Sequence, residues 1–323
     1  MTDQPLPIID ITTLFESDEI RSTGEALFKA LSNIGFAIVV GHGVPMATID
    51  GMRTAVSTIF DTPRDILARQ TVAKGNYRGF VPLGYFTPNS GKGKADQYEA
   101  WKLHTETAVN DPICHQSNLY APNRWPDINV DVKTPILAYW AEMERVSQQV
   151  LKTLSQQLGI DDTYILSCLS NPLTNMTLLN YPPLPPQSED WGIHPHKDFN
   201  LITLLAHDPV GGLEVRNRDG NWISAKCPPD GIVMNVGDML ELWSGGRLMS
   251  TPHRVTNKSG QARQSFPYFS VPRFNVWIEP LLPPIAGYER QPLHVGDSSA
   301  DIWYSNWPDT ISTDPAQELG NFE

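Results

Sequence analysis

The stretch HPHKD (194–198) places imidazole and carboxylate side chains directly before the apolar run LITLLA (201–206). His196 and Asp198 are two positions apart at the edge of this predicted strand, and residues i and i+2 of an extended chain point to the same side. His253, which begins a further predicted strand, could supply a third ligand from across a barrel. Two histidines and one carboxylate on one face of an ion leave the opposite positions open, as expected of non-haem Fe(II) sites. By itself the HxD pair is a weak signal, because an incidental pair at a strand end is more common.

A second polar pair follows in RQS, where Arg263 and Ser265 are again two positions apart. A guanidinium fork beside a hydroxyl suits bidentate capture of a carboxylate inside a barrel. Tyr181, in LLNYPP, offers a phenolic hydroxyl from a third predicted strand. These residues indicate a second binding site, for a carboxylate, near the first.

Short strands separated by turns must position these side chains, and the pattern begins at about residue 173. The predicted strands are NMTLLNY, LITLLA, GLEVRN, NWISA, GIVMNVG, HRVTN and SFPYFSV. Turn signals such as PPLPP, DPVGG, RDG and NKSG lie between them. This spacing favours a sandwich or a closed jelly roll over a parallel α/β sheet.

The first half of the chain has mainly helical periodicity. Helices are predicted over 17–35 and over Met46–Phe60, with a buried strand, GFAIVV, between them. The longest amphipathic segment, 135–159, predicts a long helix that ends at Gly159 and covers one face of the jelly roll.

We therefore expect one domain over residues 1–323, with three regions. A mainly helical N-terminal region spans 1–172, a jelly-roll core that holds the metal site spans 173–275, and a C-terminal tail spans 276–323.

Composition limits the partners. The net charge of −12 disfavours nucleic acid and anionic membranes. The three cysteines lack CxxC spacing, which favours reduced thiols, and no signal peptide or membrane span is visible. We expect a cytoplasmic protein with a small-molecule substrate and no obligate protein partner.

Taken together and in this order, NYPP, HKD, TPHRV and RQS resemble the isopenicillin N synthase-like family of Fe(II)- and 2-oxoglutarate-dependent oxygenases. The likeness extends to PIIDI, GFAIVVGHGVP, GGLEVRNRDGNWI and NVGDMLELWSGG, and covers roughly residues 6 to 275. It implies a mainly β core, a double-stranded β-helix (jelly roll) with N-terminal helices.

The resemblance also implies roles for the polar residues. The matches to the family's iron ligands are His196, Asp198 and His253. The matches to the residues that hold the distal carboxylate of 2-oxoglutarate are Arg263 and Ser265, helped by Tyr181. One position departs from many plant members, because Leu179 stands where they have an asparagine near the metal-proximal end of the cosubstrate. The orientation of the cosubstrate, or the position of the substrate, is expected to respond to this difference. His194 is expected to be exposed or to support the site without binding the metal.

The implied activity is a dioxygenase that uses Fe(II), 2-oxoglutarate and dioxygen. Oxidative decarboxylation of 2-oxoglutarate would be coupled to hydroxylation, desaturation or cyclisation at a C–H bond of a small molecule, in specialised metabolism. Asp198 argues against halogenation, since halogenating relatives have a small residue there. The alternatives are an oxidase of the same family that does not use 2-oxoglutarate, a zinc hydrolase and a jelly-roll binding module.

The sequence indicates the residues that contact the substrate less clearly than it indicates the metal ligands. By family position the side chains that could face the pocket are Phe269, Phe199, Tyr98, Trp101 and Lys102. Their aromatic character suggests a medium-sized, partly apolar substrate. The loop 87–96 and the tail after Pro280 are candidate lids.

Overall fold

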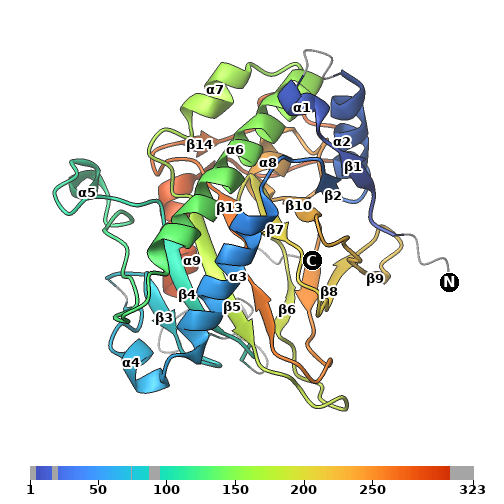
Figure 1. Ribbon diagram of the computed structural model, residues 1–323. Helices are drawn as coiled ribbons and strands as arrows, with labels where there is room; N and C mark the ends of the chain where they lie inside the picture. Colours follow the sequence, from blue (N-terminus) through green and yellow to red (C-terminus); the bar gives the residue numbers. More distant parts are fainter. Residues whose placement is uncertain (1–4, 17–20, 74, 87–94, 306–323) are drawn as a thin grey trace, which may run out of the picture.

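The computed structural model describes residues 5–16, 21–73, 75–86 and 95–305 (Figure 1). The start of the helix predicted from residue 17, most of the candidate lid 87–96 and the end of the C-terminal tail lie outside these described residues.

Two sheets form the core, as the predicted jelly roll requires. The larger sheet has the order β1-β2-β10-β7-β13-β5-β4-β3, with β12 also paired to β5. Its strands are β1 (Ile8–Asp10), β2 (Phe36–Val40), β3 (Gly79–Val81), β4 (Glu99–His104), β5 (Asn175–Tyr181), β7 (Ile202–Ala206), β10 (Ile232–Val236), β12 (Arg263–Ser265) and β13 (Tyr268–Ser270). The smaller sheet, in the order β6-β11-β8-β9, consists of β6 (Ile193–His196), β11 (His253–Val255), β8 (Leu213–Arg216) and β9 (Trp222–Ser224).

Helices cover the outer face of the larger sheet. In Figure 1, α3 (Met46–Asp61) and α6 (Lys133–Leu158) cross this face side by side, and α6 contacts β7 and β13. The remaining helices are α1 (Thr13–Glu16), α2 (Arg21–Asn33), α4 (Arg64–Ala68), α5 (Ile113–Gln116), α7 (Asp162–Ser167), α8 (Asp238–Trp243) and α9 (Val295–Ser305).

Alternation along the strands divides the apolar side chains between two clusters. On β5, Met176 and Leu178 belong to the cluster beneath the helices, whereas Leu179 and Tyr181 belong to the cluster inside the barrel. The interior cluster also includes Val215 and other residues of the smaller sheet. A period of two residues therefore separates structural packing from the space in which a site can lie.

The long helix forms as predicted, with its start two residues earlier, at Lys133. Its buried side chains, among them Met143, Val150 and Leu154, recur at three- and four-residue steps. Gly159 ends it in the left-handed conformation with φ of 70°, where its N–H bonds back to carbonyls of the last turn.

The N-terminal region supplies more of the sheet than its helical periodicity indicated. The strand predicted in GFAIVV is β2, which pairs with β10, but β4 pairs with β5 along its whole length and was not predicted. SFPYFSV was expected to be one strand, whereas β12 ends at Ser265 and β13 starts at Tyr268, after Pro267. The proline has no N–H for a ladder hydrogen bond, which explains the break.

The region taken for a tail also contains regular structure. A short ladder joins β14 (Trp277–Ile278) to β15 (Leu293–His294), and α9 follows directly. Isolated short segments of this kind carry little periodicity of their own.

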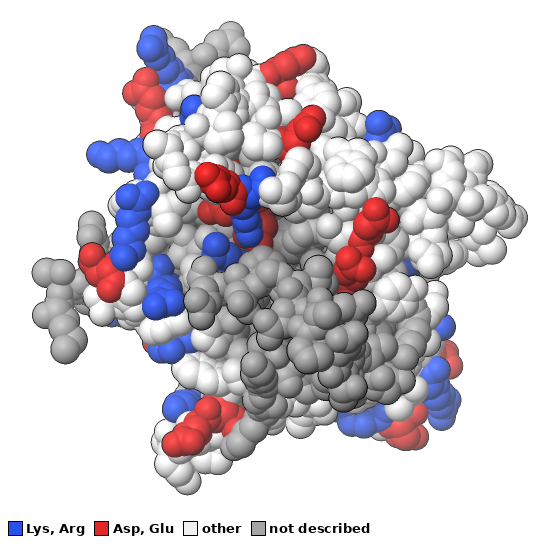
Figure 2. All heavy atoms as spheres, turned by 180° about the vertical axis from the view of Figure 1, so that it is seen from behind, with Lys and Arg blue, Asp and Glu red and all other residues white. Residues whose placement is uncertain are grey.

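None of the helices in the described part of the chain is long and apolar enough to cross a membrane. On the face shown in Figure 2, Lys and Arg side chains are interspersed with Asp and Glu. The three cysteines are free thiols.

We predict that Leu154→Ala destabilises the fold by about 2–5 kcal/mol, because the leucine is fully buried between α6 and its neighbours and its removal leaves a cavity. Reversible urea unfolding measures the loss. Gln148→Ala, at an exposed position of the same helix, is the control and should change stability by less than about 0.5 kcal/mol. Equal losses in both variants would contradict the packing described here.

Candidate active site

The register between two strands of the smaller sheet brings the histidines together. His253 of β11 lies directly opposite His196 of β6 in an antiparallel pair, and their ring centroids are 4.3 Å apart. The predicted positions of the three ligands are thereby corrected. His253 comes from the neighbouring strand and not from across the barrel, and His196 ends β6, a strand that was not predicted. Asp198 lies in the connection to β7 and not at the edge of LITLLA.

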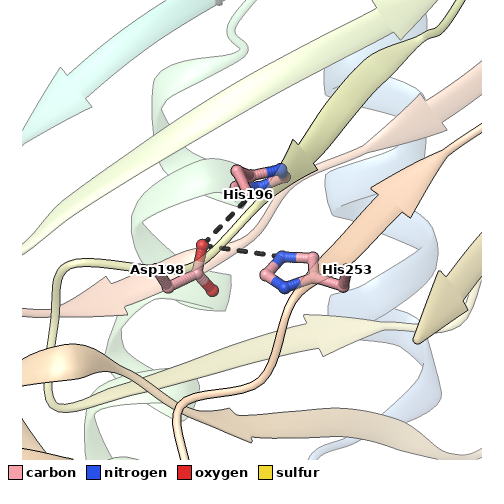
Figure 3. Close-up of side chains that lie close together, drawn as sticks. All are labelled: His196, Asp198 and His253. Atoms are coloured by element: carbon pink, nitrogen blue, oxygen red, sulfur yellow. Dashed lines mark ion pairs between the residues drawn. The ribbon is translucent and has the colours of Figure 1, made fainter. Parts of the chain in front are cut away.

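The carboxylate faces both imidazoles (Figure 3). Oδ1 of Asp198 lies 3.8 Å from Nε2 of His196 and 3.6 Å from Nε2 of His253. Both separations are shorter than twice a metal–ligand bond of about 2.0–2.2 Å, so one ion can contact the three atoms at once. Among the described residues, His196, Asp198 and His253 form the cluster of ligand side chains that could hold a metal ion.

Backbone carbonyls fix the tautomers of the two histidines. Nδ1 of His196 donates to the carbonyl of His194 over 2.8 Å, and Nδ1 of His253 donates to that of Thr251 over 3.2 Å. This leaves both Nε2 lone pairs directed at the metal position. Burial, and then the neighbouring imidazole, lowers the pKa of His196, which keeps the ring neutral as a ligand must be.

Hydrogen bonds occupy the other oxygen of Asp198. Oδ2 accepts from Thr203 Oγ1 at 2.6 Å and from Asn235 Nδ2 at 2.8 Å, while Asn200 donates to Thr203 at 2.8 Å. Burial opposes ionisation of Asp198, but the two histidines and these hydrogen bonds outweigh it and lower its pKa. The carboxylate is thus held ionised, with Oδ1 directed at the imidazoles.

His194 supports the site through hydrogen bonds, which is one of the two roles expected for it. Its Nδ1 lies 2.6 Å from Asp96 Oδ1, and the same oxygen accepts its backbone N–H over 3.0 Å. Its carbonyl in turn accepts from His196. Asp96 was missed in the sequence because the histidine that it contacts is 98 residues further along the chain.

The second polar pair lies on β12, opposite β5. Arg263 is the register partner of Tyr181, with its guanidinium carbon 4.9 Å from the phenol ring, and Ser265 is the partner of Leu179. These four side chains are almost fully buried. Arg263 Nε donates to the carbonyl of Gly211 at 2.6 Å, but its Nη1 is buried and has no hydrogen-bond partner among the described residues.

An unpaired buried guanidinium nitrogen is costly, and a carboxylate is the group whose geometry matches it. The residues therefore fit an incoming carboxylate such as that of a 2-oxo diacid. Burial raises the pKa of Tyr181, and the charge of Arg263 only partly offsets this, so the phenol stays protonated as a donor.

The turn beside Arg263 depends on Gly212. Its φ of 88° favours glycine, and a Cβ there would collide with the carbonyl oxygen of Thr256. This close approach lets the preceding Gly211 present its carbonyl to Arg263.

Comparison with known proteins agrees with this geometry. Residues 173–272 match the 2OG-Fe(II) oxygenase superfamily, and residues 6–128 match the family described as non-haem dioxygenase in morphine synthesis N-terminal. A homoarginine-6-hydroxylase from Arabidopsis thaliana is 31% identical over 293 residues, which span 85% of this chain and 87% of that enzyme. This chain belongs to the 2OG-Fe(II) oxygenase superfamily.

The resemblance drawn from the motifs is thereby confirmed, and so are Fe(II) and 2-oxoglutarate as cofactors, with His196, Asp198 and His253 as the metal triad. A validamycin A dioxygenase from Streptomyces hygroscopicus subsp. limoneus is 29% identical over 91% of this chain and 84% of its own. The crystal structure of a 2OG-Fe(II) oxygenase family protein from Caulobacter crescentus superposes with a TM-score of 0.80 at 24% identity, over 92% of this chain and 97% of that chain, which confirms the fold.

The five candidate substrate residues of this oxygenase differ in where the structure places them, and their contact with a substrate stays a prediction. Phe269 is the register partner of Thr203 and shares its face of the sheet. Phe199 follows Asp198 and is half-buried, and the Tyr98 ring lies 6.1 Å from that of Tyr181.

Lys102 faces the barrel interior from β4, but its neighbour Trp101 does not. Trp101 is fully buried in the cluster beneath the helices, 6.5 Å from Phe80, and its indole N–H donates to the carbonyl of Arg124. Consecutive strand residues face opposite ways, so Lys102 and Trp101 could not both have lined the pocket.

The site also contains residues that sequence reasoning missed. Asn235 and Thr203 support Asp198, and Phe36 packs edge-on against His253 with ring centroids 5.3 Å apart. The sequence carries a signal for Asn235 and Thr203, because each is a polar residue within an otherwise apolar strand, in MNV and ITL respectively.

We predict that alanine in place of His196, Asp198 or His253 abolishes turnover and leaves the chain folded, because two ligands hold Fe(II) poorly. Elemental analysis measures the iron content of each variant, and circular dichroism shows whether the chain is folded. His115→Ala, at an exposed histidine, is the control. A variant that keeps full activity and stoichiometric iron would remove its residue from the site.

Thr203→Val tests the support of the carboxylate. Removing the hydroxyl leaves Asp198 with one donor fewer, and changes of this kind typically weaken metal binding about 10- to 100-fold. Anaerobic Fe(II) titration measures the affinity. Thr153→Val, near the C-terminal end of α6, is the matched control and should bind iron as the wild type does. Unchanged affinity in Thr203→Val would contradict the role given to this hydrogen bond.

Proposed function

We propose that this oxygenase oxidises a C–H bond of a small molecule, by hydroxylation, desaturation or cyclisation, in specialised metabolism. The observation that carries the proposal is the buried, unpaired Nη1 of Arg263, on the sheet whose Thr203 holds the metal-binding carboxylate. Fe(II) and 2-oxoglutarate, when bound, supply the oxidising power: dioxygen and the 2-oxo acid are converted to succinate and carbon dioxide as the C–H bond is oxidised.

In this proposal Arg263 holds the distal carboxylate of 2-oxoglutarate, while Ser265 and Tyr181 add hydroxyl donors from the same face. All three are almost fully buried, and hydrogen bonds between ionised groups are strongest where water is excluded. The apolar Leu179 lies on β5, two residues before Tyr181 and opposite Ser265. It is expected to leave the metal-proximal end of the cosubstrate without the amide contact of many plant members.

The triad occupies one side of the metal position. His196 and His253 are adjacent, and Asp198 faces both, so the remaining side is open to cosubstrate and dioxygen. With its carboxylate in place, Asp198 leaves no vacancy for a halide, which favours transfer of oxygen or loss of hydrogen over halogenation.

The interior around the triad is apolar. Phe36, Val215 and Val255 are buried in the cluster that lines the barrel, and together they exclude water from the space where a C–H bond would be oxidised. Such a lining protects a reactive site and favours a partly apolar substrate.

The names of relatives agree with a small-molecule substrate. They include a homoarginine-6-hydroxylase, a validamycin A dioxygenase and gibberellin 2-beta-dioxygenase 8. These substrates differ widely in chemistry, so none of them is carried over to this chain. Cytoplasmic location and action without nucleic acid or an obligate protein partner remain predictions.

We predict that Arg263→Ala raises the 2-oxoglutarate concentration needed for half-maximal succinate formation at least about tenfold, since truncating one partner of a buried charge pair costs about 2–5 kcal/mol. Ser265→Ala should have the same effect more weakly. Arg263→Lys should recover only part of the affinity, because an ammonium group cannot reproduce the planar fork.

Succinate formation titrated against 2-oxoglutarate is the measurement, with iron content determined alongside and expected to stay near that of the wild type. Arg216→Ala, at an exposed arginine of β8, is the control. An unchanged 2-oxoglutarate requirement in Arg263→Ala would defeat the assignment. Wild-type turnover without any 2-oxo acid would instead favour the family's oxidase chemistry.

A further inference from the structure

Lys102 is the exception in a buried strand. Every other residue of β4 is buried, but the lysine remains half-exposed, and its register partner on β5 is Thr177. Ala100, on the same face, belongs to the cluster inside the barrel. The lysine thus retains accessible surface on the face that is turned to the interior.

A row of register partners links this part of β4 to the metal site. His104 lies opposite Asn175, Asn175 opposite Phe269, and Phe269 opposite Thr203, which donates to the metal-binding Asp198. Lys102 is two residues from His104 and shares its face. At about 4.8 Å per strand, β4 is about 14 Å from β7 along the sheet, so a molecule of moderate size can span from the ammonium group to the metal.

The positive charge of Lys102 has no carboxylate partner among the residues that the structure describes. Its Nζ lies 3.3 Å from Thr177 Oγ1 and 4.8 Å from the centre of the Tyr77 ring, and no carboxylate among the described residues forms an ion pair with it. Burial lowers its pKa to about 8, so the group is still mostly charged at neutral pH.

Two further basic groups, Arg78 and His104, interact electrostatically here, and the carboxylate that acts on Arg78 is that of Glu106. Arg78 is almost fully buried, and its Nε and Nη1 have no hydrogen-bond partner in the part of the chain that the structure describes. His104 is buried with an unpartnered Nδ1, and burial, followed by the charges of Arg78 and Lys102, lowers its pKa. The Trp303 ring packs beside them, with its centroid 5.1 Å from the centroids of the Tyr77 and His104 rings.

A cation that is partly removed from water and lacks an ion-pair partner among the described residues costs stability, and a ligand of opposite charge would offset this cost. Arg263 shows the same condition at the cosubstrate site. The two cations serve different ligands, because Thr177, beside Lys102, and Tyr181, beside Arg263, are separated by about 13 Å of β5 at about 3.3 Å per residue.

We propose that Lys102, with Thr177, binds a carboxylate of the substrate, so that the oxygenase acts on small organic acids. The inference rests on the proposed function and narrows its substrate class. The acid's charged end lies at β4, its apolar body passes Phe269, and the oxidised carbon lies at the metal triad.

The test uses aromatic acids, chosen for the aromatic side chains on the path, each paired with its uncharged primary amide: phenylacetate, 3-phenylpropionate and indole-3-acetate. Binding is measured by calorimetry on the anaerobic protein loaded with Fe(II) and 2-oxoglutarate. At least one acid should bind about tenfold or more tightly than its amide, as expected for a charged pair that is largely desolvated.

Lys102→Met should remove this preference and change binding of the amide by less than about twofold, whereas Lys102→Arg should keep part of it. Lys102→Gln, which retains a polar side chain, replaces the methionine variant if that does not fold. Lys258→Met, at an exposed lysine, is the matched control and should behave as the wild type.

Iron and 2-oxoglutarate binding should be unchanged in the Lys102 variants, which separates this inference from the proposed function on which it rests. Three results would overturn it: no acid that binds more tightly than its amide, a preference for the acid that persists without Lys102, or loss of 2-oxoglutarate binding in place of acid binding.

Discussion

The antiparallel register of β6 and β11 sets His196 directly opposite His253, and the rest of the site is built around this pair. A shift of one residue would turn one imidazole to the other face of the sheet and leave no common point for a metal. Asp198 completes the site from the connection that follows β6. Because no strand pairing fixes its position there, its side chain needs other contacts to hold it. Thr203 and Asn235, from two strands of the larger sheet, provide these contacts by binding one carboxylate oxygen and leaving the other for the metal. The metal site therefore joins the two sheets.

Buried positive charge is the second constraint. Arg263 and Lys102 both lie on the interior face of the larger sheet with hydrogen-bonding capacity that the described residues do not satisfy. In a fold stabilised by two apolar clusters, such groups reduce stability unless a ligand compensates them. Their separation along β5 is consistent with two ligands: in our proposals, Arg263 binds the cosubstrate and Lys102 binds the substrate. We therefore expect ligand binding by this oxygenase to depend on these two cations as well as on the metal ligands.

The sequence predicted the jelly roll, the long helix and the metal triad because each has a local signature: alternation, a period near 3.6 residues, and a spaced motif. It failed where the determining contact is distant. β4 has charged residues on both faces and reads poorly as a strand, yet its pairing with β5 places Lys102 inside the barrel and Trp101 beneath the helices. Asp96 acts on His194 through a contact that no local pattern announces. The break at Pro267 and the short elements before α9 likewise follow from pairing across the chain.

The most direct test of this account is a crystal structure of the protein grown anaerobically with Fe(II) and 2-oxoglutarate, with the iron located by its anomalous scattering. The account predicts one iron per chain, bound by Nε2 of His196, Oδ1 of Asp198 and Nε2 of His253, with the distal carboxylate of 2-oxoglutarate on Nη1 of Arg263. Iron at another position, or a cosubstrate whose distal carboxylate lies away from Arg263, would contradict it.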